Sequence, residues 1–206
     1  MNIEKGYKIC TIVDNPKIYK MITLGRLSGK LGFIYSYKAV DTDRWGESMY
    51  WEWNEGNNIL SNNSIYPCDD DAPCDLSYGE FNARENVSLS EEDKEYWMSF
   101  IDLVQENKVC NEIDTSESYK PLYYGKMFLT IGVSGWYKSF QKLGFKLYDE
   151  LFDYSFDDIQ PFEERWKHIM NECDNILEMS IEELQDKEQF LKPKIDFNAR
   201  KIRELS

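Results

Sequence analysis

The stretch YKICTIVDNPKIYKMITLGRLSGKLGFIYSY, residues 7–37, decides the fold class. Residues 7–13 are rich in β-forming side chains and short enough for a buried strand. Asn15 and Pro16 are typical of the N-cap and first residue of a helix, whose apolar stripe should end near residues 29–32. Residues 33–37, FIYSY, predict a second strand. A strand–helix–strand unit predicts two parallel strands joined by a crossover helix.

Outside this unit, an irregular segment precedes further strands and helices. Residues 41–89 are rich in Asn, Asp, Gly and Ser around MYWEWN, which predicts an ordered but irregular insertion with a short strand or hairpin at 50–53. An apolar i, i+3, i+4, i+7 pattern then predicts a helix from Ser90 to about Asn107. The later elements expected are a strand at 108–113, a helix at 116–124, a strand at 127–131, a helix at 135–143, a strand at 145–148, a helix after Pro161 and another that starts at the capping box SIEE (180–183).

Alternating strands and helices indicate an α/β domain. We therefore expect one Rossmann-like domain over residues 1–206, with a mostly parallel sheet flanked by helices. The irregular insertion at about 41–89 and a helical C-terminal tail at about 161–204 belong to the same domain. Ligands of such sheets bind beyond the carboxyl ends of the strands.

The charge of the chain excludes one class of partner. A net charge of −14 repels nucleic acid, because affinity for DNA comes largely from neutralising phosphates. Residues 1–40 are nevertheless rich in Lys and Arg, which is compatible with a pocket for a small anion or with a solvated surface of mixed charge. No apolar run approaches the ~20 residues that span a bilayer, and the first residues lack the apolar region of a signal peptide. We expect a soluble, cytoplasmic protein with no membrane contact.

The cysteines and the single histidine do not predict a metal site or a disulfide scaffold. The five cysteines are scattered, as is usual for cytosolic thiols. Cys68 and Cys74 flank DDDAP, yet no second cysteine pair follows and His168 is far away in sequence. Zinc is therefore not expected, and no separate cofactor is expected either.

Two stretches resemble a known family. KICTIVDNPKIYKMITLGRL (8–27) is similar to the opening of the C-terminal domain of phage and bacterial glycosyltransferase-like proteins. DTSESYKPLYYGKMFLTIGVSGWYKSFQKLGFKLYDELFDYSFDDIQPFEERW (114–166) resembles the second signature of the same group, and GFKLYDELFDYSFDDI (144–159) is its most specific part. FNARK (197–201) is similar to the terminal helix of the group. The resemblance covers residues 7–38 and 110–200.

The resemblance implies the nucleotide-binding half of a GT-B glycosyltransferase, a Rossmann-like domain whose substrate is a nucleotide sugar. Glu117 would hold the ribose or sugar of the donor. Lys17, Lys20 and the helix N-terminus at Asn15 would receive the diphosphate, since free N–H groups and cations bind phosphate. Lys120, from the Lys-Pro pair of the second signature, completes this set of candidate donor contacts.

The chain departs from the family at several of these positions. Val13-Asp14 stands where the family has Asn-Arg, so a carboxylate replaces a cation, and Ser118 replaces the lysine that follows the family's glutamate. The domain also leaves no room for a full acceptor domain. These departures suggest a second hypothesis, a catalytically inactive relative that acts as an acidic binding or inhibitor protein against a host enzyme or defence system.

Ordinary structural roles compete with these assignments. Glu117 could be a favourable acid in the first turn of a helix, and Lys17 and Lys20 could be solvated helix lysines. Arg165 is expected to pair with the acidic turn that follows residue 156. The acids of that region are expected to cap turns or to face solvent: Asp149, Asp153, Asp157 and Asp158.

Overall fold

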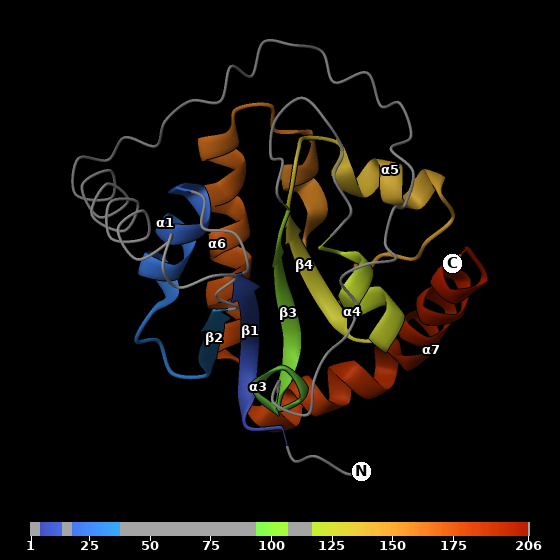
Figure 1. Ribbon diagram of the computed structural model, residues 1–206, viewed down its shortest axis with the longest axis horizontal. Coiled ribbons are helices and arrows are strands. Elements are labelled where there is room, and N and C mark those ends of the chain that lie inside the picture. The colour runs from blue at the N-terminus through green and yellow to red at the C-terminus, as the bar shows by residue number, and fades with distance from the viewer. Residues whose placement is uncertain (1–4, 14–17, 38–93, 107–116, 206) are drawn as a thin grey trace, which may run out of the picture.

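The computed structural model describes residues 5–13, 18–37, 94–106 and 117–205. Within these ranges the fold is a four-stranded sheet whose strands all run parallel, in the order β2-β1-β3-β4. Helices flank the sheet (Figure 1). The predicted α/β, Rossmann-like fold is thereby confirmed. The strands are β1 (Tyr7–Val13), β2 (Phe33–Tyr37), β3 (Ser99–Gln105) and β4 (Met127–Ile131).

Helices make up most of the rest of the described chain. The SIEE capping box forms as predicted, since Ser180 N–H donates to Glu183 Oε2 over 2.7 Å and Glu183 N–H donates to Ser180 Oγ over 3.1 Å. The helices are α1 (Ile18–Leu27), α3 (Lys94–Trp97), α4 (Tyr119–Tyr124), α5 (Trp136–Lys142), the 3-10 helix η1 (Tyr154–Asp158), α6 (Phe162–Glu178) and α7 (Ile181–Leu205).

Several elements have the predicted bounds. The strands at 7–13, 33–37 and 127–131 coincide with β1, β2 and β4. α1 ends just before Gly29 and Gly32, whose φ angles of 79° and 89° lie in the left-handed region that favours glycine and stops a helix. The predicted elements at 50–53 and 108–113 lie outside the described residues.

Two predicted elements are wrong. Only residues 94–97 of the expected helix from Ser90 are described as helical, and residues 99–105 form the strand β3. Every residue of β3 is buried, so SFIDLVQ lacks the alternation that marks a half-exposed strand, and its apolar positions also fit a helix. Residues 145–148 form no strand; Asn198 instead binds the backbone of Lys146 through both its Oδ1 and its Nδ2, each over 2.8 Å.

α1 and α6 contact each other directly beside the sheet. The indole Nε1 of Trp166 in α6 donates to Thr23 Oγ1 in α1 over 2.9 Å. Asp174 of α6 accepts from Arg26 over 2.5 Å and from Lys30. In Figure 1, α6 passes behind the strands with α1 beside it. The buried apolar face of α6 closes this side of the core with Ile169, Met170, Cys173 and Ile176.

α4 packs between β4 and α7. Ser118, just before α4, shares a 3.1 Å hydrogen bond with Thr130 of β4. Gly125 ends α4 with a φ of 65°, and a Cβ added there would lie 3.6 Å from the Cβ of Ala199 in α7. The C-terminal helix therefore contributes to the core around the sheet as well as covering its outside.

Candidate functional site

The carboxyl ends of β1 and β3 are the point where the crossovers of the sheet diverge. β1 leads through α1 to β2 at one edge, and β3 leads toward β4 at the other edge, with α4 preceding β4. Because such crossovers are right-handed, connections that run in opposite directions lie on opposite faces of the sheet. Ligands of open α/β sheets bind at this topological switch point. The candidate site therefore lies at this edge, where the structure describes Glu106 directly after β3 and the turn of Glu117 and Ser118.

Glu106, the first residue after β3, organises this edge. Its side chain is fully buried. The Oε2 atom accepts from the N–H of Glu117 over 3.1 Å, and Oε1 accepts from the N–H of Ser118 over 3.1 Å and from the Ser118 hydroxyl. The hydroxyl of Tyr19 in α1 donates to the backbone oxygen of Glu106. One residue thus ties the end of β3 to α1 and to the turn before α4.

Sequence reasoning missed Glu106. Nothing local distinguishes it from a solvated glutamate after a strand, because its partners are 11 and 12 residues away along the chain. The available signal was an acid directly after SFIDLVQ, a run with several apolar side chains, placed before a helix whose first N–H groups need acceptors. The neighbouring Gln105 is also buried, and its Oε1 has no hydrogen-bond partner within the described residues.

The structure brings two of the predicted donor residues to this edge. Glu117 is half-buried in the turn that Glu106 holds. Lys20 lies in the first turn of α1 and is only 1% exposed, so its interpretation as a solvated helix lysine is wrong. The amine of Lys120 lies 5.7 Å from the ring centroid of Tyr96. Asn15 and Lys17 lie outside the described residues.

The N-terminus of α5 is capped by a carboxylate of the chain. Asp157 Oδ1 accepts from the N–H of Tyr137 over 3.0 Å, and Oδ2 accepts from the N–H of Lys138 over 2.9 Å. Burial raises the pKa of the Asp157 carboxyl, and the two backbone hydrogen bonds oppose that rise. Asp153 caps η1 by accepting from Ser155 N–H over 2.9 Å. The prediction that these acids cap turns is confirmed.

Arg165 binds the backbone around the same turn. Its guanidinium donates to the carbonyl oxygens of Gly132 over 3.1 Å, Ile159 over 2.6 Å and Gln160 over 2.8 Å. It thereby fixes the segment after η1 to the end of β4. These contacts are structural, because they satisfy buried carbonyl groups that would otherwise lack donors.

A buried polar cluster lies between β1, β3 and the start of β4. Lys126 Nζ donates to Ser99 Oγ over 2.6 Å, to Cys10 Sγ over 3.3 Å and to the backbone oxygen of Tyr96. Asp102 is buried beside them, and neither its Oδ2 nor the Tyr96 hydroxyl has a hydrogen-bond partner in the described part of the chain. Burial raises the pKa of the Asp102 carboxyl and lowers the pKa of the Lys126 amine.

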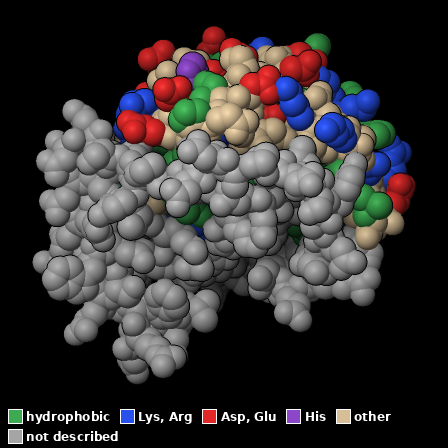
Figure 2. Space-filling view, turned by 90° about the horizontal axis from the view of Figure 1, so that it is seen from above, with side chains coloured by type: hydrophobic (Ala, Val, Ile, Leu, Met, Phe, Trp, Pro, Cys, Tyr) green, Lys and Arg blue, Asp and Glu red, His purple; other side chains and the backbone are tan. Residues whose placement is uncertain are grey.

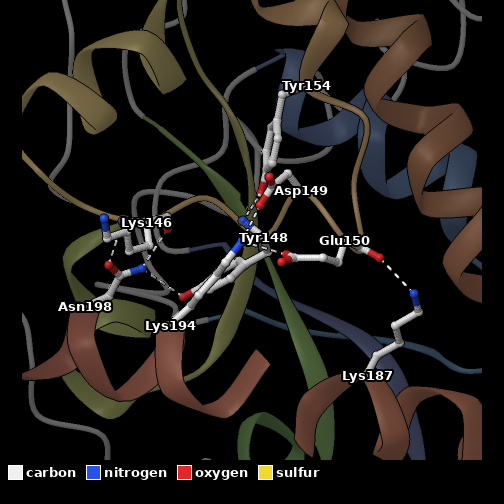
Figure 3. Close-up of polar contacts among 8 residues, drawn as sticks. All are labelled: Lys146, Tyr148, Asp149, Glu150, Tyr154, Lys187, Lys194 and Asn198. Carbon is white, nitrogen blue, oxygen red and sulfur yellow. Dashed lines mark hydrogen bonds and ion pairs between the residues drawn. The ribbon is translucent and has the colours of Figure 1, made fainter. Parts of the chain in front are cut away.

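The segment with the most specific resemblance, residues 144–159, is held on α7 by polar contacts (Figure 3). Lys187 Nζ donates to the backbone oxygen of Glu150 over 2.8 Å. Lys194 Nζ binds the Glu150 carboxylate over 2.7 Å and also that of Asp149. Nearby, the N–H of Tyr148 donates to the hydroxyl of Tyr154 over 3.3 Å. Through Lys187 and Lys194, the turn at residue 150 is therefore held against α7.

Four described basic residues near the N-terminus contact the C-terminal helices. Lys5 pairs with Glu188 in α7, and Lys8 Nζ donates to the backbone oxygen of Leu177 over 2.7 Å. Arg26 and Lys30 pair with α6, as described above. Figure 2 shows acidic and basic side chains mixed over the described part of one face. These four charged side chains therefore bind acceptors within the chain itself.

Comparisons with family models, with curated proteins and with solved structures found no significant match to this chain. The resemblance to glycosyltransferase-like proteins therefore stays a prediction. In the described ranges, no helix has both the length and the apolar character needed to cross a membrane. Among the same residues, no three or more His, Cys, Asp or Glu side chains are grouped as a metal site requires.

Proposed function

We propose that this chain is a nucleotide-sugar-binding protein of the glycosyltransferase-like type, with the donor at the carboxyl ends of β1 and β3. The position of Glu117 is the observation that supports this most. The Glu106 carboxylate holds the turn of Glu117 and Ser118 next to the end of β3, which is where ligands of open α/β sheets bind. Lys20 flanks the same edge from the side of β1.

The donor would use two kinds of contact. The Glu117 carboxylate would accept hydrogen bonds from hydroxyl groups of the ribose or sugar. Lys17, Lys20 and the start of the helix at Asn15 would neutralise the diphosphate. If sugar transfer occurs, the same cations would stabilise the negative charge that develops on the departing diphosphate, which lowers the barrier.

A non-catalytic relative that binds a partner protein is a second candidate function. A bound phosphate uses free N–H groups at helix N-termini, yet the carboxylates of Glu106 and Asp157 already take those N–H groups at α4 and α5. A carboxylate at Asp14 in place of the family's arginine favours the same candidate. Both candidates include a cytoplasmic location, in the host if the gene belongs to a phage.

Calorimetric titration with a panel of nucleotides and nucleotide sugars tests the first candidate. We expect micromolar binding of at least one of them, equivalent to about −8 kcal/mol. Glu117→Gln removes the charge but keeps the backbone N–H that Glu106 binds, so it should weaken binding about tenfold or more, ~1.4 kcal/mol. Glu164→Gln, exposed in the first turn of α6, is the matched control and should leave Kd unchanged.

The two candidates give different results in this experiment. If no nucleotide binds and none raises the melting temperature, the donor site is disproved and the non-catalytic candidate remains. If a nucleotide binds but Glu117→Gln and Glu164→Gln behave alike, the ligand sits elsewhere and the assignment of Glu117 is wrong.

A further inference from the structure

We propose that a groove on α7 is a docking surface for a cationic segment of a partner protein that carries an apolar anchor side chain. The groove has a volume of about 560 Å³ and runs between the turn at residue 150 and the first half of α7. It lies on the C-terminal helix and shares no residue with the edge formed by β1 and β3. Its lining residues are Glu150, Met179, Glu183, Asp186, Lys187 and Phe190.

Phe190 supplies an exposed apolar contact in the middle of a helix. Its side chain is 66% exposed, and Met179 beside the groove is half-buried. Covering a phenylalanine ring with an apolar side chain is favourable, because it removes apolar surface from water. Leu205, another large exposed side chain, is the last residue of α7 and lines no described groove. Phe190 is therefore the exposed hydrophobic residue best placed to receive a partner side chain.

The groove carries an excess of negative charge. Asp186 makes no hydrogen bond or ion pair with any described residue, so its carboxylate is free to bind a cation. Glu183 is exposed, and only one of its oxygen atoms takes part in the capping box. The single lysine of the groove, Lys187, is directed to the backbone oxygen of Glu150. A ligand in the groove therefore meets carboxylates around an aromatic ring.

The groove is formed before any partner arrives. Lys187 and Lys194 reach from α7 to the turn at residue 150 and hold it against the helix (Figure 3). The capping box of Ser180 and Glu183 fixes the start of α7 on the other side. Binding to a preformed groove loses less conformational entropy than binding that must order it first.

Charge complementarity selects the occupant. Nucleic acid, an anionic membrane surface and a second copy of this chain at −14 would all bring negative charge to carboxylates. A polypeptide segment with Lys or Arg around one apolar side chain satisfies both features. Its cations would pair with Asp186 and Glu183, its apolar side chain would cover Phe190, and an arginine could also stack on that ring. An amphipathic helix is the common form of such a ligand.

A labelled synthetic peptide tests the proposal on the full chain. The probe is a helical peptide of about 15 residues with Leu on one face and Lys, Arg and Ala elsewhere, measured by fluorescence anisotropy at about 0.15 M salt. We expect micromolar binding that weakens about tenfold in Phe190→Ala and in Asp186→Lys. Both residues are exposed, so circular dichroism should show an unchanged fold.

Two variants on the same helix are matched controls. Leu205→Ala removes an exposed apolar side chain outside the groove, and Glu204→Lys makes the same charge change as Asp186→Lys. Each should change Kd by less than about twofold. If the controls weaken binding as much as the groove variants, the attraction is non-specific and the proposal is overturned. Failure of the peptide to bind, or equal binding of a peptide with Glu in place of Lys and Arg, would also overturn it. Nucleotide binding is measured separately, so either proposal can fail alone.

Discussion

At the residue scale, the chain buries ionisable groups whose hydrogen-bonding capacity is not fully used. Asp102 in β3 and Lys126, directly before β4, lie in one cluster, yet Asp102 Oδ2 has no hydrogen-bond partner among the described residues. A buried charge without good hydrogen bonds costs free energy, so such a pair stabilises the fold less than its Coulomb attraction suggests. Tyr96 also belongs to the cluster, and the centroid of its ring lies 3.8 Å from Lys126 Nζ.

The pH dependence of stability should report the burial of Asp102. Because burial raises its pKa above the ordinary value of 3.8, the folded state binds a proton more readily than the unfolded state. Between 3.8 and the raised folded pKa, the wild-type protein therefore gains stability as pH falls and loses it as pH rises. Asp102→Asn cannot titrate, so its stability relative to wild type should improve as pH rises through that window, by at most about 1.4 kcal/mol per pH unit.

Urea unfolding at several pH values from about 4 to 8 measures this difference. Asp186→Asn makes the same substitution at an exposed side chain and is the matched control. If the stability of Asp102→Asn relative to wild type stays constant, or falls as pH rises, the prediction is contradicted.

At the element scale, carboxylates from other segments determine where the short helices begin. α4 begins at a turn bound by Glu106, and α5 begins where Asp157 binds two backbone N–H groups. Helices of this length are marginal alone, because nucleation is unfavourable and few hydrogen bonds follow. Their positions therefore depend on acceptors supplied by the rest of the fold.

Asp157→Ala should destabilise the protein by about 1–2 kcal/mol, because it removes the cap of α5 and leaves two backbone N–H groups, one of them buried, without an acceptor. Asp158→Ala is the matched control. Asp158 is exposed and pairs with Lys138 at the surface, a contact worth about 0–1 kcal/mol. Thermal and urea unfolding compare the two variants. An equal or larger loss for Asp158→Ala would show that the cap of α5 is not the source of stability.

At the scale of the whole molecule, α7 connects segments that are far apart in sequence. Its residue Glu188 pairs with Lys5 near the N-terminus. Asn198 binds the backbone of residue 146, and Arg203 donates to the backbone oxygen of Tyr123 in α4 over 2.6 Å. Figure 1 shows α7 running beneath the strands and along the side of α4. The C-terminal helix is thus a structural part of the fold.

Asn198→Leu keeps the approximate volume of this buried side chain but removes its bonds to the N–H and oxygen of Lys146. We expect a loss of about 1–3 kcal/mol, since two partly buried backbone groups lose their partner. Asn175→Leu, exposed on α6, should change stability by less than about 0.5 kcal/mol. Chemical denaturation gives both values. A loss below that of the control would mean that residues 145–148 are held by packing alone.

The sequence by itself determined the elements whose signals are local. Apolar runs bounded by turn residues gave β1, β2 and β4 their correct limits, and SIEE gave the start of α7. Asp153 caps the turn that it begins, as expected from an acid two residues before Ser155. These features depend on neighbours within a few residues or on side-chain types with one dominant use, so a pattern is sufficient to find them.

Only the tertiary structure decided the features whose partners are distant. SFIDLVQ is a strand because β1 and β4 pair with it on both sides, and that burial removes the alternation a strand normally shows. Residues 145–148 form no strand because Asn198, 52 residues from Lys146, takes the hydrogen bonds of that residue. Glu106 belongs to the candidate site because the fold brings Glu117 and Ser118 to its carboxylate. Such roles depend on tertiary contacts that form only when the chain folds, and no local sequence pattern encodes them.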